Sequence, residues 1–233
     1  FKIIKFIFFL QIINIFYNFI FSLFIHIFAK SINNLHKRMH RKLKNNELGR
    51  LSQEEFKSAG KINVTVVLDN IRSQHNIGAA FRTSDSFLIE KIILCGCCAT
   101  PPTAEIHKSA LGAEFSVDWE YHKETIDAIA ALKERGYTIV SIEQAENSIK
   151  LQDIEKFLNP DNSSPATAQE NLSGRKYALV FGNEVKGVQQ EVVDMSYAVI
   201  EIPQFGTKHS LNISVSLGIV LWEFCKALKI NAQ

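Results

Sequence analysis

The stretch INVTVVLDNIRSQHNIGAAFRTSDSF, residues 62–87, joins the pattern of a buried strand to the pattern of a helix. From Ile62 to Asp69 it has the run of apolar and β-branched residues expected of a strand buried on both faces. From His75 to Phe87 it consists of small and apolar residues, and we expect a helix there that is opened by Asn76. Arg82 lies in the middle of this helix. It is either a surface side chain that extends over the helix or part of a site.

The same alternation continues to the end of the chain. The pattern predicts strands at 91–96, 137–143, 177–182 and 198–203, an extended stretch at 115–121, and helices around His107, at 124–136, near 189–195 and at about 211–229. Within the helix that Gly136 closes, we expect Ile126, Ile129 and Leu132 on one apolar face. Apolar strands that alternate with helices predict an α/β fold, with a mostly parallel sheet that helices cover on both faces.

One segment breaks this rhythm. Residues 147–175 contain the sequence NPDNSSPATAQENLSG, which is rich in Ser, Asn and Pro and has no apolar period. Such a composition predicts a surface insertion within the domain at about 147–175.

Residues 1–38 differ in composition from the rest of the chain. Phe, Ile, Lys, Asn and Tyr fill 28 of these 38 positions, whereas Val, Gly, Asp and Glu are absent from them. The missing residue types have codons that begin with G, and the abundant ones have codons rich in A and T. We therefore expect this segment to be a translation of AT-rich upstream DNA, with Met39 as the native start. The alternative is a membrane anchor, because Phe6 to Phe28 is an apolar run of membrane-spanning length, with basic residues on both sides.

The charge is distributed unevenly along the chain. Residues 1–50 hold nine Lys and Arg against one acidic residue, Glu47, whereas residues 51–233 hold 17 basic and 23 acidic residues. We interpret residues 39–61 as a basic arm that precedes a single domain at 62–233. A nucleic-acid partner would meet this arm through its phosphates. The alternative is an ordinary solvated terminus.

The four cysteines give no metal-binding pattern. Cys95, Cys97 and Cys98 follow one another at the end of a strand, Cys225 lies alone in the last helix, and no second ligand pair has a suitable spacing. We therefore expect no metal. Buried, reduced thiols in a cytoplasmic protein are the better interpretation.

Ligands of parallel sheets bind where the strands end at their carboxyl ends, which directs attention to two loops. The first, FGNEVKGV at 181–188, offers Gly182 and Gly187 for a tight turn and Asn183 and Glu184 as polar groups. It can also be an ordinary turn. It matches neither a phosphate loop nor a dinucleotide-binding glycine motif.

The second loop, IPQFGTKHSLNISVSLGIV at 202–220, leads into the last helix. We expect Ser210 to cap that helix at its N-terminus. Capping by Ser210 would not account for Asn212, so the pair is a candidate for holding the polar part of a substrate or ligand.

Three stretches together, NIRSQHNIGAAFRTSDSF, LVFGNEVKGV and IPQFGTKHSLNISVSLGIVLWEF, resemble in order and spacing the three motifs of the SpoU, or TrmH-like, branch of the SPOUT RNA methyltransferases. The resemblance extends over about residues 62–228. It implies a C-terminal trefoil knot, which is an exception among protein folds. It also implies a homodimer in the cytoplasm that binds S-adenosylmethionine in the knot and methylates a ribose 2′-hydroxyl of tRNA or rRNA, with no DNA partner.

The resemblance also implies two overlapping sets of site residues. The cofactor-binding set is Ile142, Gly182, Asn183, Glu184, Ile202, Ser210 and Leu211. The catalytic set is Arg82, Asn76, Glu184, Ser210 and Asn212.

We assign Arg82 to the 2′-oxygen and the adjacent phosphate, where it stabilises the developing alkoxide or passes its proton on. Asn76 would orient Arg82 or the ribose, Glu184 would fix the neighbouring loop, and Gly78 would leave clearance for the RNA backbone. Only a short segment precedes the first strand, so substrate choice would depend on the arm, the dimer surface and the insertion.

Two alternatives remain open. The first is a non-catalytic RNA-binding protein with the same fold, which degenerated motifs would favour. The second is a membrane-tethered enzyme, which requires residues 1–38 to be native.

Overall fold

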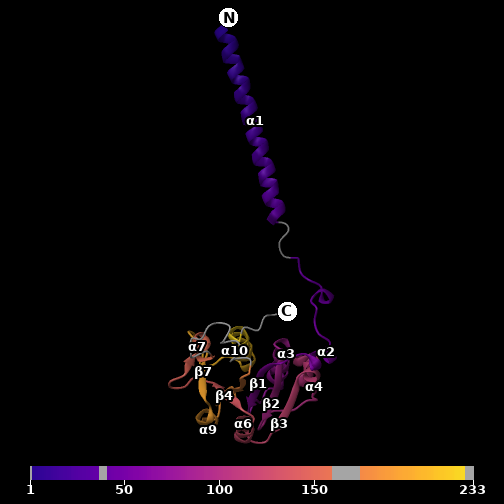
Figure 1. Ribbon diagram of the computed structural model, residues 1–233, viewed down its shortest axis with the longest axis vertical. Coiled ribbons are helices and arrows are strands. Elements are labelled where there is room, and N and C mark those ends of the chain that lie inside the picture. Colours follow the sequence, from indigo (N-terminus) through magenta and orange to yellow (C-terminus); the bar gives the residue numbers. More distant parts are fainter. Residues whose placement is uncertain (1, 37–40, 159–173, 229–233) are drawn as a thin grey trace. The chain divides into compact units, whose positions relative to one another are not determined.

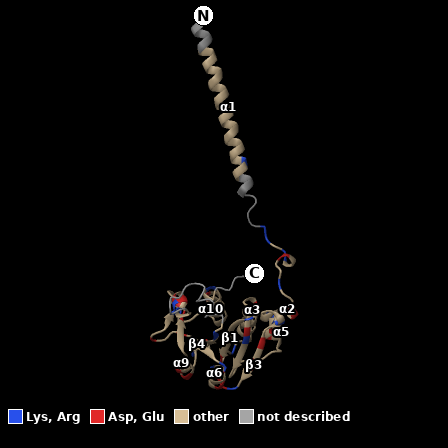
Figure 2. Cartoon of the chain, viewed as in Figure 1, with Lys and Arg blue, Asp and Glu red and all other residues tan. Residues whose placement is uncertain are grey.

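The computed structural model describes residues 2–36, 41–158 and 174–228, in two units that divide after Arg50 (Figure 1). In the first unit, Lys2–His36 forms one helix, α1, and a short 3₁₀ turn follows at Asn45–Glu47. The span Ile7–Ile32 is long and apolar enough to cross a membrane, with a mean hydropathy of 1.9. Figure 2 shows almost no charged residue along its described side chains. Met39, the expected native start, lies outside the described residues.

The second unit is built on a parallel sheet. Its strands are β1 (Ile62–Asp69), β2 (Ile89–Cys95), β3 (Asp118–His122), β4 (Tyr137–Ile142), β5 (Ile149–Lys150), β6 (Lys176–Phe181) and β7 (Ala198–Glu201). They lie in the order β3-β2-β1-β6-β4-β7-β5, and every neighbouring pair runs parallel. The α/β expectation is therefore confirmed. All carboxyl ends of the strands point to one edge of the sheet.

Helices cover both faces of this sheet (Figure 1). One face carries α2 (Gln53–Ser58), α3 (Gln74–Ser86), α4 (Ala104–Ala110), α5 (Ala113–Ser116), α7 (Ile154–Leu158) and α10 (Ile213–Ala227). The other face carries α6 (Thr125–Glu134) and α9 (Gln190–Met195). Alternate residues of the strands supply the two cores, as in β1, where Val66 packs on the first face and Val67 on the second.

Several element boundaries differ from the sequence prediction. Helix α3 is opened by Ser73, whose side-chain oxygen accepts from the backbone N–H of Asn76, so Asn76 is not the cap. The stretch expected to be extended at 115–121 starts with the short helix α5, and the strand begins only at Asp118. In α6, Ile126 is exposed while Ala128 is buried beside Ile129 and Leu132.

The predicted insertion is only partly a surface segment. Its first part forms β5, a 3₁₀ turn at Leu151–Asp153 and α7, and it buries Leu151, Ile154 and Leu158 in the main core. The apolar period is too short to be recognised in the sequence, because each element has at most five residues. Residues 159–173, most of the Ser- and Pro-rich stretch, lie outside the described residues, as does the expected end of the last helix at Lys229.

The predicted basic arm, residues 39–61, likewise lies only partly outside the folded domain. Its second half belongs to the domain, because α2 begins with a capping box formed by Ser52 and Glu55 and buries Phe56 in the main core. In its first half, Arg41 forms an ion pair with Glu47 at 2.9 Å. The folded domain thus begins at about Leu51 and not at Ile62.

Gly78 is a packing residue. A Cβ at this position would lie 2.2 Å from Ser109 Oγ and 2.3 Å from the carbonyl oxygen of Ile106. Helices α3 and α4 therefore approach each other at Gly78, which is buried. The expectation that Gly78 provides clearance for RNA is wrong, because α4 already occupies that space.

The four thiols are free, as expected, but they are not all buried. Cys95, Cys98 and Cys225 are buried, whereas Cys97 is exposed because it lies in the turn after β2.

Candidate functional site

A cavity of about 650 Å³ opens at the carboxyl ends of β4, β6 and β7. Three loops form its walls: the residues after Ile142, the turn from Gly182 to Gly187, and the segment that leads from Ile202 to α10. All seven residues predicted to bind a cofactor line this cavity: Ile142, Gly182, Asn183, Glu184, Ile202, Ser210 and Leu211. Parallel strands bring these loops together because their carboxyl ends share one edge of the sheet.

The turn after β6 requires glycine at its base. A Cβ on Gly182 would lie 2.1 Å from both the carbonyl carbon of Gly187 and the backbone nitrogen of Val188. Gly187 has a φ of +70°, which side chains disfavour. The turn is closed by two backbone hydrogen bonds between Asn183 and Gly187, of 3.1 and 2.8 Å.

The Asn183 side chain holds this turn through hydrogen bonds to three backbone groups. Its Oδ1 accepts from the backbone N–H groups of Val185 and Lys186 at 2.9 and 3.2 Å. Its Nδ2 donates to the carbonyl of Asn70, at the end of β1, at 2.9 Å. Asn183 is thus placed at the cavity but acts through the shape of the loop.

Two carboxylates that the sequence analysis missed support the same turn. The Glu143 carboxylate accepts from the backbone N–H of Val188 at 2.9 Å. Asp69, which is fully buried at the end of β1, accepts from the Gln189 backbone N–H at 3.0 Å and from Thr125 Oγ1 at 2.6 Å. The only sequence signal for either is a carboxylate directly after an apolar strand, on the edge where the loops meet.

The third loop corrects the prediction about capping. Helix α10 begins at Ile213, and Asn212 is its N-cap, with Oδ1 accepting from the backbone N–H of Ser214 at 2.9 Å. Ser210 lies two residues before the cap, exposed at the cavity wall. The polar pair is therefore divided between a structural cap at Asn212 and a lining residue at Ser210.

Residues from all three motifs meet beside the cavity. Asn76 Nδ2 donates to Glu184 Oε1 at 2.7 Å, and Asn212 Nδ2 donates to Asn76 Oδ1 at 3.3 Å. These bonds link the start of α3, the turn after β6 and the start of α10. Asn76 thus binds the two loops, and no hydrogen bond joins its side chain to Arg82 among the described residues.

Arg82 lies one to two turns further along α3 and is exposed. Its guanidinium has neither an ion pair nor a hydrogen bond within the described part of the chain, and it does not line the cavity. A helical arginine without a partner is therefore available to an external anion.

Comparison with known proteins identifies this arrangement. The model of the SpoU rRNA methylase family matches residues 63–222. The chain belongs to this family. The sequence resemblance is therefore confirmed, and with it the expectation of a SpoU-type, S-adenosylmethionine-dependent RNA 2′-O-methyltransferase.

Individual relatives support the assignment over most of the domain. An uncharacterised tRNA/rRNA methyltransferase of Borreliella burgdorferi is 30% identical over 71% of this chain and 64% of its own length. A tRNA (guanosine(18)-2′-O)-methyltransferase of Thermus thermophilus is 28% identical over 73% of this chain and 78% of its own. The structure of an rRNA methyltransferase from Sinorhizobium meliloti with bound AdoMet has a TM-score of 0.59 and 26% identity, and covers 77% of this chain and 62% of that one.

The cavity fits the cofactor of the SpoU family. Its volume lies within the range of small-molecule sites, and the close backbone approach at Gly182 fixes the shape of the turn that forms one wall. Glu143 and Glu184 place two carboxylates on the wall, which suits a positively charged sulfonium. The knot that the family implies stays a prediction.

Proposed function

We propose that this chain methylates a ribose 2′-hydroxyl of one tRNA or rRNA, as a homodimer. The observation that carries the proposal is the pair of hydrogen bonds that joins Asn76, Glu184 and Asn212 beside the cavity. The three motif residues come from distant parts of the sequence and support one another at the wall of the cavity.

Within this proposal the chain positions the ribose and manages its proton. When bound, S-adenosylmethionine supplies a methyl group that a sulfonium makes electrophilic. A ribose hydroxyl is a weak nucleophile and must lose its proton as it attacks. Arg82 contacts the 2′-oxygen and the neighbouring phosphate, so that its fork of N–H donors stabilises the developing negative charge. Because an arginine keeps its proton at neutral pH, Arg82 acts as the stabiliser, and the phosphate can accept the proton.

Asn76, Glu184 and Asn212 act as positioning residues. Their hydrogen bonds fix the start of α3 against the two loops that line the cavity. Arg82 is carried on the same helix, so these bonds set its distance from the cofactor cavity. Ser210 and the backbone of the turn at Gly182 line the binding space itself.

The exposed face of α10 supports the homodimer. Val215, Ile219 and Trp222 are exposed and follow one another at helical spacing, so they form an apolar stripe. The ring of Trp222 lies 6.5 Å from that of Phe87, at the end of α3, so the stripe runs beside the helix that carries Arg82. A second copy that covers the stripe would bury it and approach Arg82, which the cavity of one chain does not include.

The proposed substrate places the enzyme in the cytoplasm. That location depends on residues 1–38 not acting as an anchor. Degenerated motifs would favour the non-catalytic alternative, but Arg82, Glu184, Ser210 and Asn212 are all present in the sequence, which supports the catalytic proposal.

The test is to map 2′-O-methylated positions in tRNA and rRNA from cells with and without this gene. We expect the loss of one position or a small related set, restored by the wild-type chain and not by Arg82→Ala. An unchanged methylation pattern in cells that lack the gene would contradict the proposal.

A further inference from the structure

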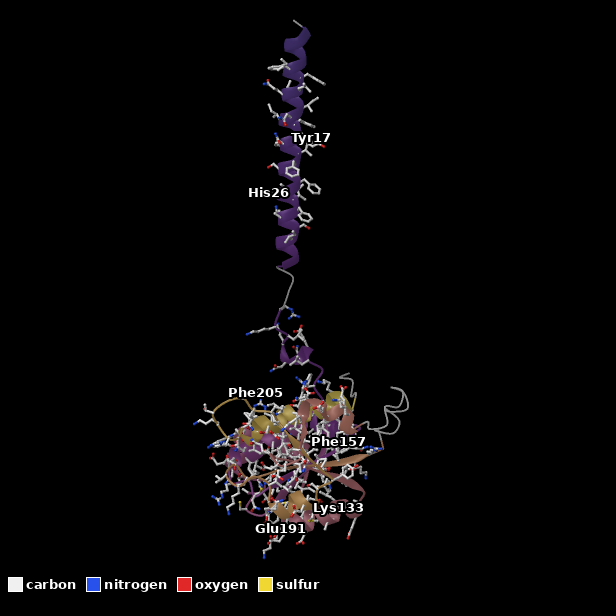
Figure 3. The ribbon with its side chains drawn as sticks, turned by 90° about the vertical axis from the view of Figure 1, so that its left-hand side faces the viewer. Tyr17, His26, Lys133, Phe157, Glu191 and Phe205 are labelled. Atoms are coloured by element: carbon white, nitrogen blue, oxygen red, sulfur yellow. The ribbon has the colours of Figure 1, made fainter. Side chains whose placement is uncertain are left out.

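One aromatic side chain stands free at the rim of the cavity. Phe205 is 97% exposed, and it lies on the loop between β7 and α10, which stands out from the body of the domain (Figure 3). Gln204 before it and Lys208 after it line the cavity, whereas Phe205 itself does not. Its ring therefore faces outward, beside the opening.

Two cations border the same opening. Lys186, on the turn after β6, and Lys208 both line the cavity and are exposed. Neither ammonium group forms an ion pair with any residue in the described ranges. The carboxylates on that wall already accept hydrogen bonds from this chain: Glu184 from Asn76 and Glu143 from the backbone of Val188. The lysines therefore remain available to an anion outside the cavity.

An exposed ring beside unpaired lysines has the chemistry that recognises unpaired nucleotides. Single-stranded bases stack on aromatic side chains, and lysines contact the phosphates on either side. We propose that Phe205 stacks on a base of the substrate RNA next to the methylated ribose, while Lys208 contacts a neighbouring phosphate. The inference rests on the proposed function, and it makes this loop part of the recognition of an unpaired RNA segment.

The position of the ring distinguishes this role from cofactor binding. A ring that covered the cofactor would line the cavity, and Phe205 does not. Among the residues that line the cavity, only Val185 and Leu211 are large, exposed apolar side chains within the described loops, and neither is aromatic. A second copy of the chain is the other possible occupant, and it is an outcome of the test.

The experiment compares Phe205→Ala, Phe205→Trp and Phe205→Leu in the full chain, with Tyr197→Ala as the control. Tyr197 is also an exposed aromatic, but it lies directly before β7, at the end of that strand opposite the cavity. The measurements are the affinity for the RNA identified by mapping, the affinity for S-adenosylmethionine by calorimetry, and the oligomeric state by sedimentation. We expect Phe205→Ala to weaken RNA binding on the order of tenfold. Trp should restore the affinity, whereas Leu should not, because it is apolar but has no aromatic face.

A second variant tests the phosphate contact. Lys208→Ala should reduce the steepness of log affinity against log salt concentration by about one unit, which corresponds to the loss of one phosphate contact. Lys123→Ala, an exposed lysine after β3, should leave that slope unchanged. An unchanged slope for Lys208→Ala would remove Lys208 from the proposal.

Three results would overturn the role of Phe205. Equal RNA affinity of Phe205→Ala and the wild type would exclude stacking, and a lost cofactor affinity would place the ring over the cofactor. A change to monomers would assign the ring to a second copy of the chain. A wild-type protein that neither binds nor methylates RNA would instead contradict the proposed function itself.

Discussion

The side-chain amide of Asn76 donates to the carboxylate of Glu184 at 2.7 Å, although 108 positions separate the two residues. Asn76 also accepts from Asn212, so it joins two loops of the cavity to α3. The bond to Glu184 is partly buried and has a carboxylate acceptor, so it contributes more than the exposed bond between the two amides of Asn76 and Asn212.

Removal of the Glu184 carboxylate tests this link. Glu184→Ala leaves the Asn76 amide without its acceptor, and we expect the free energy of unfolding to fall by about 1–2 kcal/mol. Methyl transfer should fall with it, because α3 is no longer fixed to the loop. Glu184→Gln keeps an acceptor oxygen and should lose less. Thermal unfolding and a methyl-transfer assay measure both effects, with exposed Glu146→Ala as the control. Wild-type stability and activity in Glu184→Ala would show that the bond does not matter.

Replacement of Arg82 separates catalysis from folding. Because Arg82 is exposed and does not line the cavity, Arg82→Ala should change the free energy of unfolding by less than about 0.5 kcal/mol and leave cofactor affinity unchanged. Methyl transfer should be abolished, and Arg82→Lys should recover little of it, since a lysine cannot donate from two parallel N–H groups. Arg135→Ala, at an exposed arginine directly after α6, serves as the control. Full activity of Arg82→Ala would refute the assigned role.

Strands β1, β2, β4, β6 and β7 and their parallel arrangement could be predicted because each is a short, largely apolar run. Strand β5 was missed because it has only two residues. The start of β1 at Ile62 and that of β4 at Tyr137 coincide with the prediction. The prediction was wrong where a local signal was ambiguous. Ser210 and Asn212 are both good caps, and only the backbone shows that α10 starts after Asn212. Ile126 suits an apolar face, but the position of α6 on the sheet turns it to solvent and buries Ala128.

The location of the cavity could also be predicted, because strand ends identify it. The contacts within the site could not, since they depend on distances between residues far apart in the sequence. Gly78 shows this most clearly. A glycine near a candidate catalytic residue suggested space for RNA, but its neighbour is the backbone of α4.

The buried thiols make the stability of the folded chain depend on pH. Burial raises the pKa of Cys95 to about 12 and that of Cys98 and Cys225 to about 11, from an ordinary value of 9.0. Their contribution to stability is fully present below pH 9. It is lost as the pH rises toward 11 and 12, because the unfolded chain then releases protons that the folded chain retains.

Two measurements check this behaviour. At pH 8 a thiol reagent should modify only the exposed Cys97 in the folded chain, and all four cysteines after denaturation. Denaturation at pH 7, 9 and 10 should show stability falling with pH, and less steeply in Cys225→Ala. Reaction of all four thiols in the folded protein at pH 8 would contradict the burial of the other three.

Replacement of Gly182 tests whether the turn after β6 determines the shape of the cavity. A Cβ there would lie 2.1 Å from two backbone atoms of the opposite side of the turn, so Gly182→Ala must displace the segment from Gly187 to Val188. We expect cofactor affinity to fall by more than about tenfold, and the free energy of unfolding to fall by about 1–3 kcal/mol, the usual cost of overpacking. Gly60→Ala is the matched control, because a Cβ at that position has nothing within 4 Å. Calorimetric titration with S-adenosylmethionine and thermal unfolding of both variants give the result. Equal cofactor affinity in the two variants would mean that the turn can move without changing the cavity, and that the close approach at Gly182 serves folding alone.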